Sequence, residues 1–205
     1  MRLSTRVGIL LLAGSLGMIA SSPQQGAPPG GYPVGRNQTG GAQVPSSITA
    51  TLDFQLSIEE REVIGLADAM PEDKYSFAPT NGEFKGVRTF GQQLKHVAAA
   101  NFIYASSILG EKPPVDVGED EDGPASLKGK DEIIQYLKRS FAYVQKAVAT
   151  ISANNVVTPF KNPFGDGQAT RLSMVTFIIG HCDDHYGQLD LYLRMNGIEA
   201  AAGRR

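Results

Sequence analysis

Apolar side chains recur at steps of three and four residues in four separate segments of the chain, and this spacing constrains the fold more than any other feature. None of the segments shows the sustained alternation of apolar and polar residues that indicates strands. The sequence therefore predicts an all-α fold, a four-helix bundle. The segments run from Ile48 to Met70, from Thr89 to about Ile108, from about Lys130 to Ser152, and from about Thr170 to Asn196–Gly197.

Signals at the segment ends support these boundaries. Pro71 ends the first segment because proline cannot continue a helix, and Thr89-x-x-Gln92 is a capping-box pattern at the start of the second. The connections 71–88 and 110–129 are long for a bundle, in which a handful of residues usually joins two helices. Long loops often cover a functional site, so we expect a site beside them.

The first 22 residues have the pattern of an export signal. Arg2 and Arg6 precede an uncharged, largely apolar stretch from Val7 to Ala20, which is too short for a comfortable membrane span. We expect residues 1–22 to be a signal peptide and the chain to be exported, periplasmic or secreted, with no stable membrane insertion after cleavage. The alternative is an uncleaved segment that tethers the chain to a membrane.

Residues 23–47 are rich in proline and glycine. Such a composition buries too little apolar surface to offset the conformational entropy of ordering, so we expect a disordered linker. The predicted organisation is a signal peptide (1–22), a linker (23–47) and a helical-bundle domain (48–199).

Composition argues against several classes of function. The formal net charge is −2 without a basic stripe, which argues against a nucleic-acid partner, because Lys and Arg contacts to phosphate supply most of that affinity. A single cysteine, Cys182, excludes an intramolecular disulfide framework and a cysteine-based zinc knuckle. The acidic run 119–122 lacks the spacing of an EF-hand, so we expect a solvated loop rather than a Ca²⁺ site.

All three histidines fall on the predicted inner faces of helices. His181 and His185 are four residues apart, so their side chains lie only about 40° apart around the helix axis, and His96 lies beside the apolar stripe of the second helix. Three imidazoles from two helices give a three-ligand arrangement that leaves a metal position open for water or substrate. The alternative is that each histidine is a core residue satisfied by one hydrogen bond.

Residues beside the histidine pair are candidates for a supporting role. Asp184 and Gln188 lie on one side of the pair, where a carboxylate that accepts an imidazole N–H would fix the tautomer; the alternative for Asp184 is a solvent-facing position. Cys182 lies about 100° from His181 around the helix and is expected to pack as a small apolar residue. Because Cys182 follows His181, the chain lacks the His-Glu-x-x-His pattern of zinc proteases. Catalytic residues beyond the metal ligands are not identified.

The fourth segment resembles the last-helix signature of the DinB-like (DinB/YfiT) superfamily, and His96 resembles the first histidine of that family. The resemblance implies an up-down-down-up bundle in which His96, His181 and His185 hold a divalent transition metal, with Zn, Ni or Fe as the expected ions. It also implies a homodimer, because dimers are frequent in this superfamily. The run that carries it is His181-x-x-x-His185-Tyr186-Gly187-Gln188-Leu189-x-x-Tyr192-Leu193-Arg194-x-x-Gly197.

The three histidines and the resemblance to the DinB-like superfamily together suggest a metal-dependent enzyme. Known members include thiol-dependent S-transferases and a maleylpyruvate isomerase, but the thiol-dependent members work in the cytoplasm, whereas an export signal is expected for this chain. We expect an exported divalent-metal-dependent enzyme whose metal activates water or a thiol, for hydrolysis of a small-molecule substrate or transfer to it. The alternatives are a non-catalytic bundle that binds a metal or a partner, and a bundle whose histidines bind nothing. Because imidazole must be neutral to bind metal, we expect metal affinity to fall as the pH drops through about 6.5.

Overall fold

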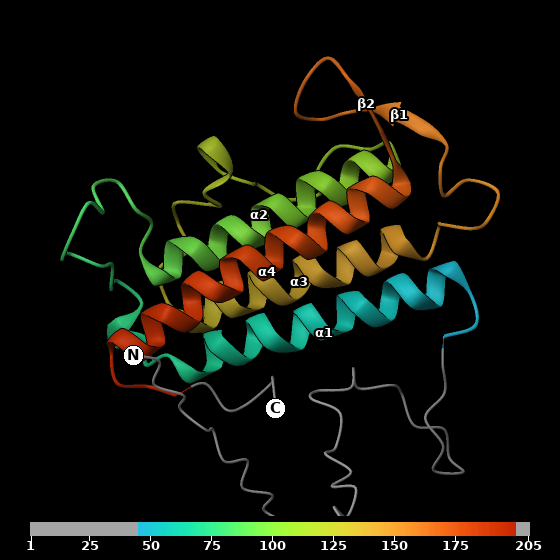
Figure 1. The fold of residues 1–205 in the computed structure, drawn as a ribbon. Coiled ribbons are helices and arrows are strands. Elements are labelled where there is room, and N and C mark those ends of the chain that lie inside the picture. The colour runs from blue at the N-terminus through green and yellow to red at the C-terminus, as the bar shows by residue number, and fades with distance from the viewer. Residues whose placement is uncertain (1–44, 200–205) are drawn as a thin grey trace, which may run out of the picture. The chain divides into compact units, whose positions relative to one another are not determined.

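The computed structural model describes residues 45–199. The predicted signal peptide and nearly all of the predicted linker lie outside the described residues, so both stay predictions. None of the described helices has both the length and the apolar character that crossing a membrane requires. The structure confirms the predicted four-helix bundle (Figure 1). Its helices are α1 (Ile48–Ala69), α2 (Phe90–Leu109), α3 (Lys130–Val148) and α4 (Arg171–Met195), with the 3₁₀ turns η1 (Glu72–Lys74) and η2 (Glu119–Glu121) in the connections.

The four helices are arranged up-down-down-up. α1 and α2 each pack against both α3 and α4. Lys130 at the start of α3 donates from Nζ to the carbonyls of Asp68 and Met70 at the end of α1, at 2.7 and 2.9 Å, so these two helices are antiparallel. Figure 1 shows α2 running in the same direction as α3, and α4 running with α1. The connection 110–129 is long because it must return along the bundle to join two parallel helices.

The capping signals of the sequence are present in the structure. The Thr89 side chain accepts from the N–H of Gln92 while the Gln92 side chain accepts from the N–H of Thr89, which closes the capping box of α2. After α4, Gly197 has a left-handed backbone with φ 71°, as the Asn196–Gly197 pair predicts. Local sequence therefore determines where these helices begin and end.

Two details differ from the prediction. α3 ends at Val148 rather than at Ser152, because Ile151 is buried from a turn after the helix and so extends the apolar periodicity beyond it. A two-stranded antiparallel hairpin, β1 (Pro159–Lys161) and β2 (Gln168–Thr170), precedes α4 although the sequence predicts no strand. Strands of three residues are too short to show a period of two.

The core lies between the helices and is filled by aliphatic and aromatic side chains. The buried residues of α4 include Ile178, Cys182, His185 and Leu189, which follow one another at steps of three and four. Packing of this apolar stripe therefore turns the histidine side of α4 inward. The largest fully buried side chains are Tyr136, Phe90, Phe141, Leu56, Leu66, Met70, Leu94, Leu137, Ile178, Leu189, Leu193 and Val63.

Replacing Leu137 by Ala is expected to lower the free energy of unfolding by about 2–5 kcal/mol, because the side chain is fully buried and its removal leaves a cavity. The matched control is Leu191→Ala in α4, where the side chain is 52% exposed and the expected change is below about 0.5 kcal/mol. Urea denaturation of the full-length chain measures both values. Equal losses in the two variants would contradict the buried position of Leu137.

Candidate metal centre

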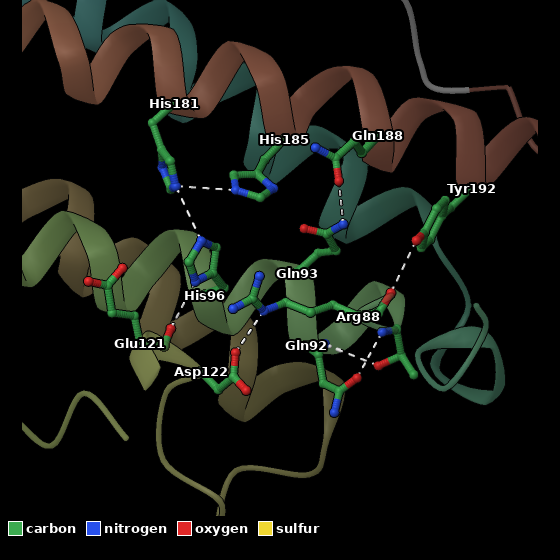
Figure 2. Close-up of polar contacts among 11 residues, drawn as sticks. Arg88, Gln92, Gln93, His96, Glu121, Asp122, His181, His185, Gln188 and Tyr192 are labelled. Carbon is green, nitrogen blue, oxygen red and sulfur yellow. Dashed lines mark hydrogen bonds and ion pairs between the residues drawn. The ribbon is translucent and has the colours of Figure 1, made fainter. Parts of the chain in front are cut away.

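The structure brings the three histidines of the chain to one point between α2 and α4 (Figure 2). Nε2 of His181 lies 3.3 Å from Nε2 of His96 and 3.2 Å from Nε2 of His185. One ligand nitrogen from each ring lies within 4.8 Å of the other two. Among the described residues, these histidines form the group of side chains whose spacing suits a metal ion.

Helix geometry explains this convergence. His181 and His185 are one turn apart on α4, so both side chains project from one face of the helix toward α2. His96 lies within a continuous run of buried residues on α2 and faces them from the opposite side. His96 and His185 expose only 9% and 7% of their surface, and His181 is half-buried. The three side chains thus face the bundle interior, as their helical spacing predicts.

A main-chain carbonyl fixes the tautomer of His96. Its Nδ1 lies 3.0 Å from the carbonyl oxygen of Glu121, and a carbonyl can only accept, so Nδ1 carries the proton and Nε2 keeps a free electron pair. Glu121 has a left-handed backbone with φ 62°, and so does Asp120 with φ 49°. Residues other than glycine adopt this conformation rarely, and such strain is concentrated at functional sites. The loop thus holds His96 in the form that binds a metal.

The nitrogen geometry fits a metal ion better than it fits hydrogen bonds between the rings. Because Nε2 of His96 is unprotonated, at most one well-directed hydrogen bond can join the three Nε2 atoms. A zinc ion bound at about 2.0–2.1 Å in a tetrahedral arrangement places its nitrogen ligands about 3.3–3.4 Å apart. The two separations, 3.3 and 3.2 Å, match that edge. The donor set therefore fits a divalent transition metal.

Burial keeps these imidazoles neutral. Desolvation is the main cause that lowers the pKa of His181 to about 3 and that of His185 to about 4, and the charges of neighbouring imidazoles and of Arg88 act in the same direction. Desolvation also lowers the pKa of His96, with the charge of Arg88 as the second cause. Neutral imidazole is the form that binds metal, so all three rings are ready ligands at neutral pH.

The residues expected to support the histidines contact them only indirectly. Asp184 accepts from Nε2 of Gln188 at 3.0 Å, and Oε1 of Gln188 accepts from Nε2 of Gln93 on α2 at 2.6 Å. Asp184 makes no hydrogen bond to an imidazole, because it is exposed and lies about 100° around the helix from His185. Nδ1 of His181 and Nδ1 of His185 have no hydrogen-bond partner among the described residues.

Both long connections reach the site, as their length predicts. Arg88, from the first connection, pairs through Nε with Asp122 of the second at 2.7 Å. The Tyr192 hydroxyl of α4 donates to the carbonyl of Arg88 at 3.1 Å, which ties the first connection to the bundle. Residues 119–122 thus do more than form the expected solvated loop, because Glu121 contacts His96 and Asp122 pairs with Arg88.

Sequence reasoning missed Arg88, Gln93 and Asp122. Two of them had a readable signal: Gln93 lies one turn before His96 on α2, and Arg88 directly precedes the capping residue of the same helix. Glu121 acts through its main-chain carbonyl and through loop geometry, which residue type does not reveal.

Aromatic side chains line another side of the cluster. Phe177 stacks on His181 with ring centroids 6.3 Å apart, and Tyr104 meets the His181 ring edge to face at 5.7 Å. Phe164, from the turn between β1 and β2, contacts Tyr104 at 4.9 Å and Phe177 at 6.5 Å. Phe164 and Phe177 are about half exposed. The unpredicted hairpin thus adds an aromatic side chain to the apolar side of the site.

Cys182 is packed in the core, as the sequence predicts. It is fully buried, its Sγ lies 3.9 Å from Oδ1 of Asn101, and burial raises the pKa of the thiol far above its usual range. Asn101 is fully buried as well and donates from Nδ2 to Oγ of Ser140 at 3.2 Å, so it has the partner that a buried amide requires. Cys182 thus behaves as a small apolar residue rather than as a nucleophile.

A pocket of about 370 Å³ lies next to the histidines. His185 belongs to both the pocket and the histidine cluster, so a small molecule in the pocket touches one of the candidate metal ligands. The volume is near the lower end of the range for small-molecule sites. The lining residues are Gly86, Val87, Arg88, Gln93, Asp122, His185 and Gln188.

Comparisons with known proteins agree with this architecture. The structure is similar to a DinB-like protein from Bacillus cereus, at 17% identity and a TM-score of 0.60, with 78% of this chain and 99% of that chain covered. It is also similar to a conserved protein from Enterococcus faecalis, at 14% identity and a TM-score of 0.59, with 73% and 96% covered. These similarities show the fold alone, and no curated protein matches the chain. The family model of the DinB superfamily matches residues 55–189, and the chain therefore belongs to the DinB superfamily.

Proposed function

We propose that this chain is a divalent-metal-dependent enzyme that acts on a small-molecule substrate. The observation that carries the proposal is the convergence of the Nε2 atoms of His96, His181 and His185 beside a pocket. Three protein ligands are the number found in catalytic zinc sites, which keep a position open for water or substrate. Zn, Ni or Fe is the proposed ion, because imidazole suits all three.

Residues around the histidines prepare such a site. The carbonyl of Glu121 holds His96 with its Nε2 electron pair free, and Tyr104 and Phe177 cover the ring of His181. When bound, the metal supplies a Lewis acid that lowers the pKa of a nucleophile toward neutrality. The single cysteine, Cys182, is buried in the core, so a thiol nucleophile has to come from outside the chain.

Water and a small thiol are the proposed nucleophiles, which correspond to hydrolysis of the substrate and to transfer of a thiol to it. The proposal includes export through residues 1–22 and no stable membrane insertion after cleavage, with tethering by an uncleaved segment as the alternative. It also includes a homodimer, as the DinB superfamily suggests. These parts rest on the sequence pattern and the family.

A non-catalytic protein that sequesters a metal or binds a partner is the alternative. Structural zinc sites are closed by four protein ligands. In the part of the chain that the structure describes, the candidate ligand group consists of three histidines, and one of them also lines a pocket. Both observations favour the enzyme.

The purified full-length chain is expected to bind about one divalent transition metal ion. Replacing His96 or His181 by Ala is expected to weaken metal affinity by more than about 100-fold, because even changes to residues behind the ligands cost 10–100-fold. Elemental analysis after dialysis measures bound metal, and circular dichroism checks that the variants keep their helices.

Asp183→Asn is the matched control for metal binding. It alters an exposed carboxylate on α4 between the two histidines of that helix, and we expect it to leave the metal content unchanged. Two results would contradict the proposal: a wild-type chain that binds none of Zn²⁺, Ni²⁺ and Fe²⁺, or histidine variants that retain the wild-type metal content.

The lowered histidine pKa values predict how the stability of the metal-free chain depends on pH. An unfolded histidine has a pKa of about 6.5, whereas the folded values are about 3 for His181 and about 4 for His185. Between these limits the unfolded state binds more protons, so the free energy of unfolding falls as the pH drops below about 6.5. Each histidine contributes a slope of up to about 1.4 kcal/mol per pH unit. Urea denaturation across this range should show a shallower slope for His185→Phe, and an unchanged slope would contradict the pKa shift.

The lowered pKa values of the histidines also lower the pH at which the metal is lost. The sequence-based value of about 6.5 assumes an ordinary histidine, but protons compete for these nitrogens only at lower pH because burial keeps them neutral. We expect the folded chain to keep its metal down to about pH 5 and to lose it near about pH 4. Equilibrium dialysis with elemental analysis at each pH measures this, and half-loss near pH 6.5 would count against the buried site.

A further inference from the structure

The pocket beside His185 contains an amide oxygen without a partner. Gln93 is only 2% exposed, it lines the pocket, and its Oε1 is buried without a hydrogen-bond partner among the described residues. Leaving a buried acceptor unsatisfied is costly, and most buried polar atoms in folded proteins are paired. The oxygen therefore indicates a ligand that brings a donor to it.

Neighbouring groups fix the orientation of the Gln93 amide. The Asp184 carboxylate can only accept, so Gln188 donates to it from Nε2. Oε1 of Gln188 then faces Gln93 and can only accept, so Gln93 donates to it from Nε2. The Tyr192 hydroxyl donates to the carbonyl of Arg88, and the Gln93 amide lowers the pKa of Tyr192, which agrees with an N–H turned toward the hydroxyl. Nitrogen and oxygen of the amide therefore cannot exchange places. In Figure 2, Oε1 points away from Gln188, toward the side of the histidines.

Arg88 lines the same pocket and has hydrogen-bonding capacity left. Its ion pair with Asp122 uses Nε, and its terminal amino groups make no hydrogen bond to another described residue. Figure 2 shows these amino groups on the side of His96. A guanidinium edge with two parallel N–H groups matches a carboxylate. Arg88 is the one cationic side chain among the lining residues, so a singly charged group suits the pocket better than a dianion.

We propose that the pocket binds the carboxylate end of the substrate, with Arg88 holding the carboxylate and Oε1 of Gln93 accepting from an adjacent amide N–H or hydroxyl. The substrate class is thus a small carboxylic acid with a neighbouring donor, such as an N-acyl amino acid or a hydroxy acid. This inference rests on the proposed function in that the rest of the substrate extends to the metal beside His185.

Charge around the pocket favours an anion once a divalent cation is bound. Arg88 and Asp122 balance each other, and the three neutral imidazoles add no charge of their own. The carboxylates of Glu121 and Asp184 also act on these imidazoles, and a divalent cation offsets their negative charge, which would otherwise repel a carboxylate in the pocket. The affinity for a carboxylate is therefore higher in the Zn²⁺ form than in the metal-free form.

Three probes of similar size test the two contacts separately. N-acetylglycine has both the carboxylate and the amide N–H, N-acetylglycinamide lacks the carboxylate, and acetoxyacetate replaces the N–H by an oxygen. NMR titration of the full-length chain, without metal and with Zn²⁺, measures the dissociation constants. We expect the wild type to bind each of the two analogues at least about tenfold more weakly than N-acetylglycine.

Each substitution should abolish one preference and keep the other. Arg88→Gln removes the preference for the carboxylate, and Gln93→Leu removes the preference for N–H over oxygen. Gln93→Met is a second variant without the amide oxygen, used if Gln93→Leu loses its helical circular dichroism. The control Arg139→Gln removes an exposed arginine of α3 that does not line the pocket, and both preferences should remain.

Equal affinities of the wild type for the three probes would overturn the inference. A carboxylate preference that needs Zn²⁺ and survives Arg88→Gln would overturn it as well, because the carboxylate would then sit on the metal. Failure of the proposed function has a different signature. A chain that binds no metal but keeps both preferences refutes the metal-dependent enzyme and supports carboxylate binding in the pocket. A chain that binds metal and shows neither preference supports the metal centre and refutes carboxylate binding in the pocket.

Discussion

Three imidazole nitrogens that point at one another inside a helical bundle are the constraint on which this structure depends. Buried polar atoms normally find hydrogen-bond partners, yet these Nε2 atoms lie 3.3 and 3.2 Å apart with at most one good hydrogen bond among them. The helices hold them there because the stripes that bury α2 and α4 include His96 and His185. The free energy of core packing therefore maintains an arrangement that the histidines alone would not adopt.

The loop between α2 and α3 fixes the tautomer of His96, which the helices alone do not determine. Gly118 and Gly123 have positive φ, and a side chain on Gly118 would collide with the carbonyl of Gly123, so glycine is required where the turn closes. Between them, Glu121 takes a left-handed conformation and directs its carbonyl at His96. One tight turn thus sets the protonation pattern of a buried ring on a neighbouring helix.

The difference between what the sequence predicted and what it missed has a physical cause. Helical periodicity repeats over about twenty residues, so it revealed the four helices and the inward faces of the three histidines. Side-chain pairing depends on rotamers and on neighbours from other elements, so the sequence left open whether Asp184 meets an imidazole or faces solvent, and in the structure it is exposed and pairs with Gln188. Arg88 and Glu121 reach the site from loops, and the contact of Glu121 uses a main-chain atom that every residue type shares.

Asp184 reaches the site through Gln188 rather than through an imidazole, and this keeps the histidines uncharged. A carboxylate that accepts directly from an imidazole raises the basicity of that ring, which favours its protonated form. Asp184 instead hydrogen-bonds to Gln188, and although its charge raises the pKa of His181, burial outweighs it and keeps that pKa at about 3. Gln188 is uncharged, and its Oε1 accepts from Nε2 of Gln93, so the hydrogen bond to Asp184 fixes the orientation of both amides without bringing a negative charge next to the imidazoles. An exposed carboxylate thereby orients a buried amide while the imidazoles stay neutral, the state that a metal ligand requires.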